Sequence, residues 1–120
     1  MQDFKKLEVW QLAHGLTLGV YRLTKAFPHD ERFGLTDQMR RAAISIESNL
    51  AEGAGRGGDA DFARFVQIAF GSACELECQL LLARDLNHAG GQQLPELLES
   101  LERVKRMLSG LLRKLKTDSR

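Results

Sequence analysis

Three glycines in the stretch NLAEGAGRGGDADF have the GxGxxG spacing of a loop that binds a dinucleotide phosphate: Gly53, Gly55 and Gly58. That chemistry needs a β-strand before the glycines and a helix after them, because the phosphate rests on backbone N–H groups where the helix begins. Residues 1–52 show no strand pattern, and the residues before Gly53 recur with a helical period. We therefore interpret the glycines as a helix end and a turn, and we expect no nucleotide cofactor.

The two cysteines, Cys74 and Cys78, lie four residues apart and so on one face of a helix. A disulfide at this helical spacing has poor bridge geometry. Zinc would require two further ligands, which no nearby CxxC or HxxxH motif supplies. The spacing favours two buried free thiols, which pack as small apolar side chains.

Groups able to catalyse a reaction are few. His14, His29 and His88 fall in three different predicted elements, and no serine or cysteine has a histidine at a helical neighbour position. The Glu-x-x-His pairs of di-iron bundles do not occur. We expect no metal, no cofactor and no enzymatic activity.

Basic residues are the remaining groups with a ligand chemistry of their own, because lysine and arginine neutralise phosphates without reading bases. The formal net charge is only +1, but residues 103–120 carry a net +6 and residues 1–102 a net −5. The alternative is that these charges serve solubility and match the helix dipole. Candidate nucleic-acid contacts are Arg40, Arg41, Arg56 and Arg64, expected around the glycine-rich turn, and Arg103, Lys105, Arg106, Arg113, Lys114 and Lys116 near the C-terminus.

Apolar residues recur at alternating steps of four and three residues, which predicts amphipathic helices and excludes alternating strands. We predict four helices over about residues 4–27, 36–53, 59–88 and 95–116. Short connections between four such helices predict an all-α fold, a single domain over residues 1–120 built as an antiparallel up-down-up-down four-helix bundle.

Local signals place the helix ends. Thr36 and Asp59 are expected N-caps. The glycine-rich stretch is expected to end the second helix in left-handed C-cap geometry, and the Gly90-Gly91 pair to end the third. Pro95 is expected at the first position of the fourth helix.

The third predicted helix has two apolar faces. One stripe runs from Phe62 to Ala83, and a second runs from Phe70 to Leu81 on an adjacent face. One partner helix cannot cover both, so this helix must contact several helices or a neighbouring subunit. We predict a homo-oligomer whose interface contains Trp10, Phe65, Ile68, Phe70, Cys74, Cys78 and Leu81.

Polar residues form stripes beside the apolar ones on the second and third helices. Two interpretations stay open: solvated faces, or a buried or subunit-spanning network that pairs Arg41 with Glu75. The stripes comprise Arg41, Ser45, Asn49 and Glu52 on the second helix, and Ser72, Glu75 and Gln79 on the third.

No uninterrupted apolar run approaches the roughly 20 residues that cross a bilayer, and MQDFKKLEVWQ lacks the apolar stretch of a signal peptide. We expect a cytoplasmic protein with no membrane contact.

Three stretches, FKKLEVWQLA, FPHDERFGLTDQMRRAAISIESNLAEGAGR and FARFVQIAFGSACELECQL, make the chain resemble a known family. This is the family of small four-helix bundle proteins named for reading frames in intervening sequences of bacterial 23S rRNA genes. The resemblance covers about residues 4–115. One departure is Glu47, which stands where the family pattern usually has proline, so the second helix is expected to be straighter here.

The resemblance implies a homopentamer of bundles that forms a barrel without enzymatic activity. The same fold family includes accessory variability proteins of diversity-generating retroelements, which look like basic pentamers that bind nucleic acid and a reverse transcriptase. We expect a non-catalytic, self-associating bundle that binds RNA or DNA, or a nucleic-acid enzyme, through basic helix surfaces. The alternative is a structural scaffold for a protein partner, such as a reverse transcriptase, without direct nucleic-acid binding.

Overall fold

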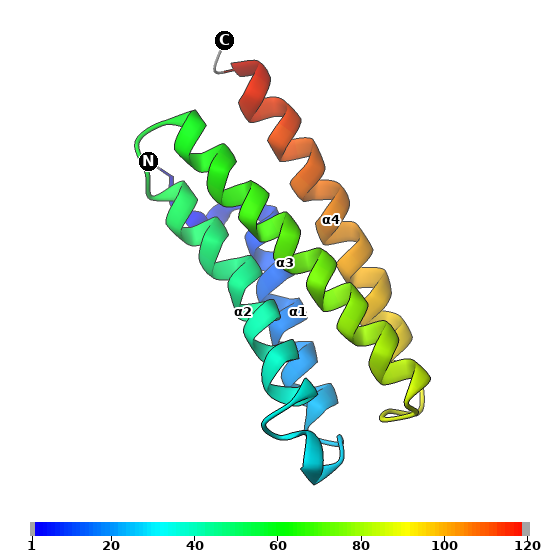
Figure 1. The fold of residues 1–120 in the computed structure, drawn as a ribbon. Helices are drawn as coiled ribbons and strands as arrows, with labels where there is room; N and C mark the ends of the chain where they lie inside the picture. The colour runs from blue at the N-terminus through cyan, green and yellow to red at the C-terminus, as the bar shows by residue number, and fades with distance from the viewer. Residues whose placement is uncertain (1, 119–120) are drawn as a thin grey trace.

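The computed structural model describes residues 2–118, which form four long helices joined by short connections (Figure 1). Successive helices run in opposite directions, which confirms the predicted up-down-up-down bundle. Each helix packs against two neighbours, and α1 lies diagonally across the bundle from α3. The elements are the 3₁₀ turn η1 (Phe4–Lys6), α1 (Glu8–Thr24), the 3₁₀ turn η2 (His29–Glu31), α2 (Leu35–Ala54), α3 (Asp59–Asp85) and α4 (Gln93–Asp118).

The predicted apolar stripes form the core. On α3, Val66, Leu76 and Leu80 are fully buried, and Met39 and Ile46 of α2 lie among the core residues with them. Burying each such side chain contributes about 1.5–3 kcal/mol to stability. The heptad pattern therefore places the core correctly.

The N-terminal ends of the helices differ from the prediction. α1 begins at Glu8 and not near residue 4, because Asp3 caps a separate 3₁₀ turn and Leu7 is extended. Gly34 precedes α2, so Thr36 is a buried residue of the first turn and no cap. Its capping role falls to Glu31 Oε1, which accepts a hydrogen bond from the Leu35 N–H at 3.3 Å.

Other predicted ends are also corrected. α1 ends at Thr24, three residues before the predicted position. α2 ends at Ala54 with Gly55 as its C-cap at φ −79°, and Gly58 before α3 is extended at φ −141°, so the left-handed geometry predicted for this turn is wrong. Asp59 is accordingly the first residue of α3 and not its cap.

α3 ends at Asp85, earlier than predicted, because Asn87 adopts the left-handed φ of 58° that was expected of the glycines after it. The His88 N–H then returns to the Ala83 carbonyl at 3.0 Å, the closing hydrogen bond of a Schellman motif. α4 begins at Gln93, so Pro95 lies within its first turn, where the missing N–H would have had no helical partner.

Within residues 2–118, α3 is the one helix long and apolar enough to cross a bilayer by length and composition, with a mean hydropathy of 1.3 over 18 residues. The sequence shows no uninterrupted apolar run of that length, because Glu75 and Glu77 divide this helix. The mean hydropathy of the helix is high despite these two charges. Only 39 % of that window is buried in the bundle. The high hydropathy reflects a second apolar face that the chain itself leaves uncovered.

Candidate functional site

The glycine-rich turn is a packing feature. Gly53 lies inside α2, and a Cβ atom there would be 2.8 Å from the Phe65 Cβ and 2.9 Å from a Phe62 ring carbon. The residue therefore lets α2 and α3 approach closely where they meet. This geometry supports the interpretation of a helix end followed by a turn, with no strand before it.

Only two of the four arginines predicted around this turn lie there. Arg56 and Arg64 both place their guanidinium groups over the Phe65 ring, at 5.0 and 4.5 Å from its centroid. Each also has an acidic partner: Glu52 lies 3.1 Å from Arg56, and Asp61 lies 3.8 Å from Arg64. Their charges are therefore largely compensated within the chain.

Arg40 and Arg41 lie near the beginning of α2, roughly 20 Å from the turn along the helix axis at 1.5 Å per residue, so their predicted place is wrong. Arg40 is tied to α1. Its Nε donates to Thr24 Oγ1 at 2.9 Å, and its guanidinium lies 4.4 Å from the centroid of the Tyr21 ring. It joins two helices, and within residues 2–118 its charge has no acidic partner.

The predicted pair between Arg41 and Glu75 is not formed within the chain. Arg41 Nε donates instead to Asp37 Oδ2 at 2.9 Å, one turn earlier on α2. Glu75 of α3 lies on the other side of a shallow groove that Arg41 and Asp37 also line. The polar stripes do meet at Ser45 and Ser72, whose hydroxyl oxygens lie 2.8 Å apart, so they form a partly buried contact between α2 and α3.

The outward face of α4 carries a row of exposed positive charges. Arg103, Arg106, Arg113 and Lys114, called here the α4 basic stripe, are all exposed. Arg103, Arg113 and Lys114 make no ion pair within residues 2–118, and Arg106 lies 3.7 Å from Glu102. Lys116 is exposed one turn further along, and Arg120 lies outside the described residues.

A groove of about 330 Å³ runs beside this stripe, between α3 and α4. It is called here the α3–α4 groove, and it is lined by Phe70, Glu102, Lys105, Arg106, Ser109 and Arg113.

Lys105 is the cation of this groove that is held most firmly. Its Nζ donates to Glu77 Oε1 at 2.8 Å and lies 5.9 Å from the centroid of the Phe70 ring. The hydrogen bond to Glu77 raises the pKa of Lys105 above its ordinary value, against a smaller opposing effect of burial. This lysine is therefore committed to a contact between helices.

The outward face of α3 carries several exposed apolar side chains, with the exposed Glu75 among them. Ile68, Cys74, Cys78 and Leu82, called here the α3 outer face together with Gly71, are exposed. Ile68 is 43 % and Leu82 49 % exposed, large fractions for aliphatic side chains at the middle of a helix. The prediction of buried thiols is wrong for the single chain, because both cysteines point away from the core.

The other predicted interface residues lie elsewhere. Phe65 is buried against Gly53 within its own chain, while Trp10, Phe70 and Leu81 are half-buried. Leu82 was not among the predicted residues, although its position four residues after Cys78 is the signal that could have shown it.

A second group of exposed apolar side chains lies on another side of the bundle. Leu18, Tyr21 and Ile44, called here the α1–α2 patch, are 47 %, 36 % and 40 % exposed. Tyr21 and Ile44 line one shallow groove, together with Arg40 and Arg41. No predicted site included these three residues.

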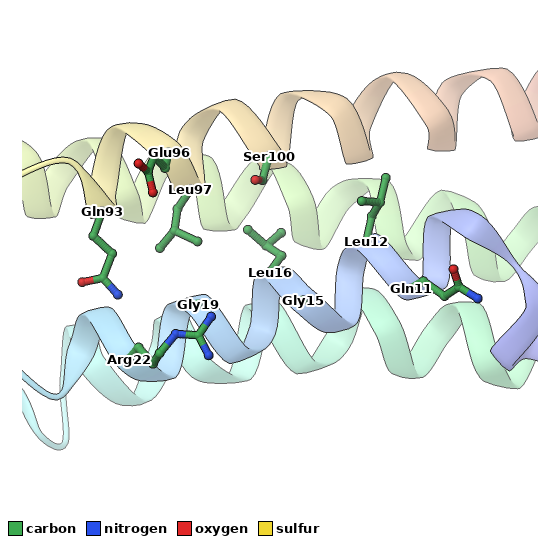
Figure 2. Close-up of a pocket in the computed structure, with 10 residues that line it drawn as sticks. All are labelled: Gln11, Leu12, Gly15, Leu16, Gly19, Arg22, Gln93, Glu96, Leu97 and Ser100. Carbon is green, nitrogen blue, oxygen red and sulfur yellow. The ribbon is translucent and has the colours of Figure 1, made fainter.

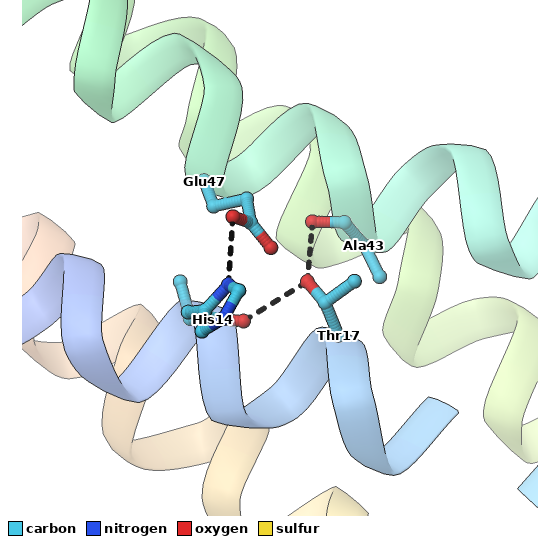
Figure 3. A network of polar contacts seen from close by, with 5 residues as sticks. His14, Thr17, Ala43 and Glu47 are labelled. Carbon is cyan, nitrogen blue, oxygen red and sulfur yellow. Dashed lines mark hydrogen bonds and ion pairs between the residues drawn. The ribbon is translucent and has the colours of Figure 1, made fainter. Parts of the chain in front are cut away.

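Trp10, a predicted interface residue, is engaged within its own chain. Its ring stacks on His14 with centroids 4.9 Å apart, and His14 Nδ1 lies 3.0 Å from Glu47 Oε2 (Figure 3). Beside this pair, Thr17 Oγ1 lies 3.2 Å from the Ala43 carbonyl oxygen, to which it donates. Glu47, in the family's proline position, thus lies in an unbroken α2 and ties it to α1.

A groove of about 360 Å³ separates α1 from α4 (Figure 2). Gly15 and Gly19 form part of its floor, and a Cβ at Gly19 would meet Leu97 of α4 at 2.5 Å. Arg22 and Glu96 are the charged residues of its lining. The groove offers an apolar floor with mixed polar edges and no pairing of a nucleophile with a base.

Titratable groups do not gather into a reactive centre. In residues 2–118, no three His, Cys, Asp or Glu side chains lie where they could hold a metal ion. The pair of His88 and Glu31, 2.8 Å apart, joins the two connections at one end of the bundle. The hydrogen bond from His88 and a second from the Leu35 N–H lower the pKa of Glu31.

The comparisons with known proteins agree with this fold. A family model described as "23S rRNA-intervening sequence protein" matches residues 5–110. The chain belongs to this family. Among curated proteins, none matches the chain.

A solved structure resembles this member of the 23S rRNA-intervening sequence protein family. It is the crystal structure of a protein of unknown function from the S23 ribosomal protein family of Bacteroides thetaiotaomicron, with a TM-score of 0.77 and 20 % sequence identity. The match covers 87 % of this chain and 97 % of that one. At this identity the likeness shows a shared fold.

Proposed function

We propose that this protein is a non-catalytic, self-associating helical bundle that binds RNA or DNA through the α4 basic stripe. The observation that carries the proposal is the row of exposed, mostly unpaired cations on one rigid helix. Guanidinium and ammonium groups held at helical spacing neutralise successive phosphates without reading bases. A backbone-binding surface of this kind needs no catalytic group.

Self-association rests on the apolar surfaces. The α3 outer face and the α1–α2 patch come from different helices, and α1, which carries Leu18 and Tyr21, does not contact α3. If the patch of one copy covers the outer face of the next, the contact is heterologous and closes into a ring when the rotation between copies allows. A pentameric ring would repeat the α4 basic stripe five times on one particle and strengthen binding through multivalency.

Binding to a fluorescent oligonucleotide at increasing salt tests nucleic-acid recognition. We expect the affinity to fall steeply with salt, and Arg113→Gln or Lys114→Gln to reduce the slope of that dependence by about 0.7–0.9 each. Arg41→Gln is the matched control, because Arg41 is paired with Asp37 on another helix. Absence of binding at the lowest salt would contradict the proposal.

A second candidate function is a scaffold that gathers a protein partner, such as a reverse transcriptase, without touching nucleic acid. It is favoured by the internal ion pairs of Arg41, Arg56 and Arg64 and by Phe33, which is 84 % exposed at one end of the bundle. Co-purification from a host extract separates the two functions. A nuclease-resistant protein partner indicates the scaffold, and nuclease-sensitive cargo indicates nucleic-acid binding.

A further inference from the structure

Gly110 is a half-buried glycine in the interior of α4, and helical spacing places it on the side of the helix that faces away from the core. Glycine there is less favourable to the helix than alanine, so its presence calls for a reason. Packing within the chain does not supply one, because a Cβ at this position would find only Arg113 Nη2 within 4 Å, at 3.9 Å. At Gly53, by contrast, Phe62 and Phe65 of α3 leave no room for a Cβ atom.

The surroundings of Gly110 are cationic. Helical spacing places Arg106 one turn before it, and Arg113 and Lys114 one turn after it, all exposed on the same face. Position 110 adds no side chain of its own between these cations, and the one side-chain atom within 4 Å of a Cβ built there is Arg113 Nη2, at 3.9 Å. Glycine serves in this way where a ligand must approach a backbone closely.

An aromatic ring lies in the α3–α4 groove, which shares Arg106 and Arg113 with this side of α4. Phe70 of α3 and Ser109 of α4 both line the α3–α4 groove, next to Arg106 and Arg113. Phe70 is half-buried, so its ring is fixed by the bundle while part of it reaches the groove. A flat apolar ring beside phosphate-binding cations is the combination that binds unpaired bases by stacking.

We propose that this surface binds a single strand, with the sugar–phosphate backbone crossing α4 at Gly110 and one base stacked on Phe70. The inference rests on the nucleic-acid binding proposed above and narrows its ligand from any nucleic acid to an unpaired one. A duplex cannot place a base in the groove without unpairing and unstacking it. Lys105 is paired with Glu77 and Arg106 with Glu102. The phosphate contacts are therefore expected from Arg103, Arg113 and Lys114.

Fluorescence anisotropy with labelled poly-U and poly-dT 20-mers and a 20-base-pair duplex tests this site. We expect the wild-type protein to bind the single strands more tightly than the duplex, with a logarithmic salt slope of about −2 from three phosphate contacts. Phe70→Leu should weaken single-strand binding about fivefold or more, as loss of one stacked base does, and leave duplex binding unchanged.

Gly110→Ala is the second variant, and it cannot fail by unfolding. We expect it to raise the Tm by a few degrees, because alanine favours the helix, and yet to weaken single-strand binding. Gly15→Ala is its control, since Gly15 also has open space within 4 Å but lies on α1. That variant should show the same stabilisation with unchanged affinity.

The outcomes separate the two proposals. Failure of the wild-type protein to bind any of the probes at low salt would overturn nucleic-acid binding and this site with it. Equal or tighter binding of the duplex, or unchanged single-strand affinity in both Phe70→Leu and Gly110→Ala, would overturn the single-strand site alone. A change in particle mass in Gly110→Ala with unchanged affinity would assign Gly110 to subunit contact and also overturn the site.

Discussion

Glycines at helical positions of this bundle differ in what a side chain would meet. At Gly53 a Cβ would fall within 3 Å of Phe62 and Phe65, and the nearer atom is a Cβ that cannot rotate away. At Gly15 the same atom would find nothing within 4 Å. The sequence alone shows two glycines in amphipathic helices, and only the packing separates their roles.

We expect Gly53→Ala to lower the free energy of unfolding by about 1–3 kcal/mol, because α2 and α3 must move apart to admit the methyl group. Gly15→Ala should raise it by up to about 1 kcal/mol through helix propensity. Urea unfolding followed by circular dichroism measures both. Equal effects of the two substitutions would contradict the close contact at Gly53.

Glu31 makes stability depend on acid. Because hydrogen bonds from His88 and the Leu35 N–H lower its pKa in the folded state, its contribution is complete above the unfolded pKa of about 4.5 and is lost as the pH falls through the lower folded pKa. Glu31→Gln should therefore lose less stability than the wild-type protein between pH 6 and pH 3. Urea titrations at the two pH values test this, with Glu99→Gln, an exposed carboxyl of α4, as the control that should keep the wild-type loss.

At the scale of the elements, the sequence predicted what the heptad pattern determines. The number of helices, their order and their buried stripes follow from burial of one face of each helix. Moving a predicted helix end by a residue or two does not change which residues lie on that face. The ends depend on single hydrogen bonds that no pattern shows, such as the contact of Glu31 with the Leu35 N–H. At the end of α3, Asn87 has the left-handed φ that was expected of the Gly90-Gly91 pair, of which only Gly91 has a positive φ.

The contact between α3 and α4 includes one ion pair whose removal should act on two properties. Lys105 Nζ is held at 2.8 Å by Glu77 beside the α3–α4 groove. Glu77→Gln should lower the free energy of unfolding by about 0.5–1 kcal/mol, because a partly exposed pair contributes little more. The freed lysine should then strengthen binding of a poly-U oligonucleotide at low salt.

Unfolding in urea and anisotropy measured on the same preparations check both effects. Glu99→Gln removes a negative charge from α4 away from the groove and controls for net charge. A gain in affinity equal in the two variants would assign the effect to overall charge and not to Lys105.

For the whole molecule, the candidate site was predictable in part. The charge excess of the C-terminal segment indicated α4, and the second stripe indicated an uncovered face on α3. Which arginine side chains are held within the chain could not be predicted, since Arg40 contacts Tyr21 and Thr24 of α1 across a helix contact that only the fold creates. The α1–α2 patch was not predicted for the same reason, as its three residues come from two helices.

The two apolar surfaces make the geometry of self-association testable. Leu82→Arg disables the α3 outer face and Ile44→Arg disables the α1–α2 patch, and both side chains are about half exposed, so each bundle should fold. If one surface binds the other, each variant alone should be monomeric by light scattering, whereas an equimolar mixture should form dimers and nothing larger. One intact patch then meets one intact outer face, and no further contact is possible.

Phe33→Ser, at an exposed site on neither surface, should leave the wild-type mass unchanged. Two-fold contact through the α3 outer face alone would give a different result, because Ile44→Arg would then keep the wild-type mass and mixing would restore nothing to Leu82→Arg.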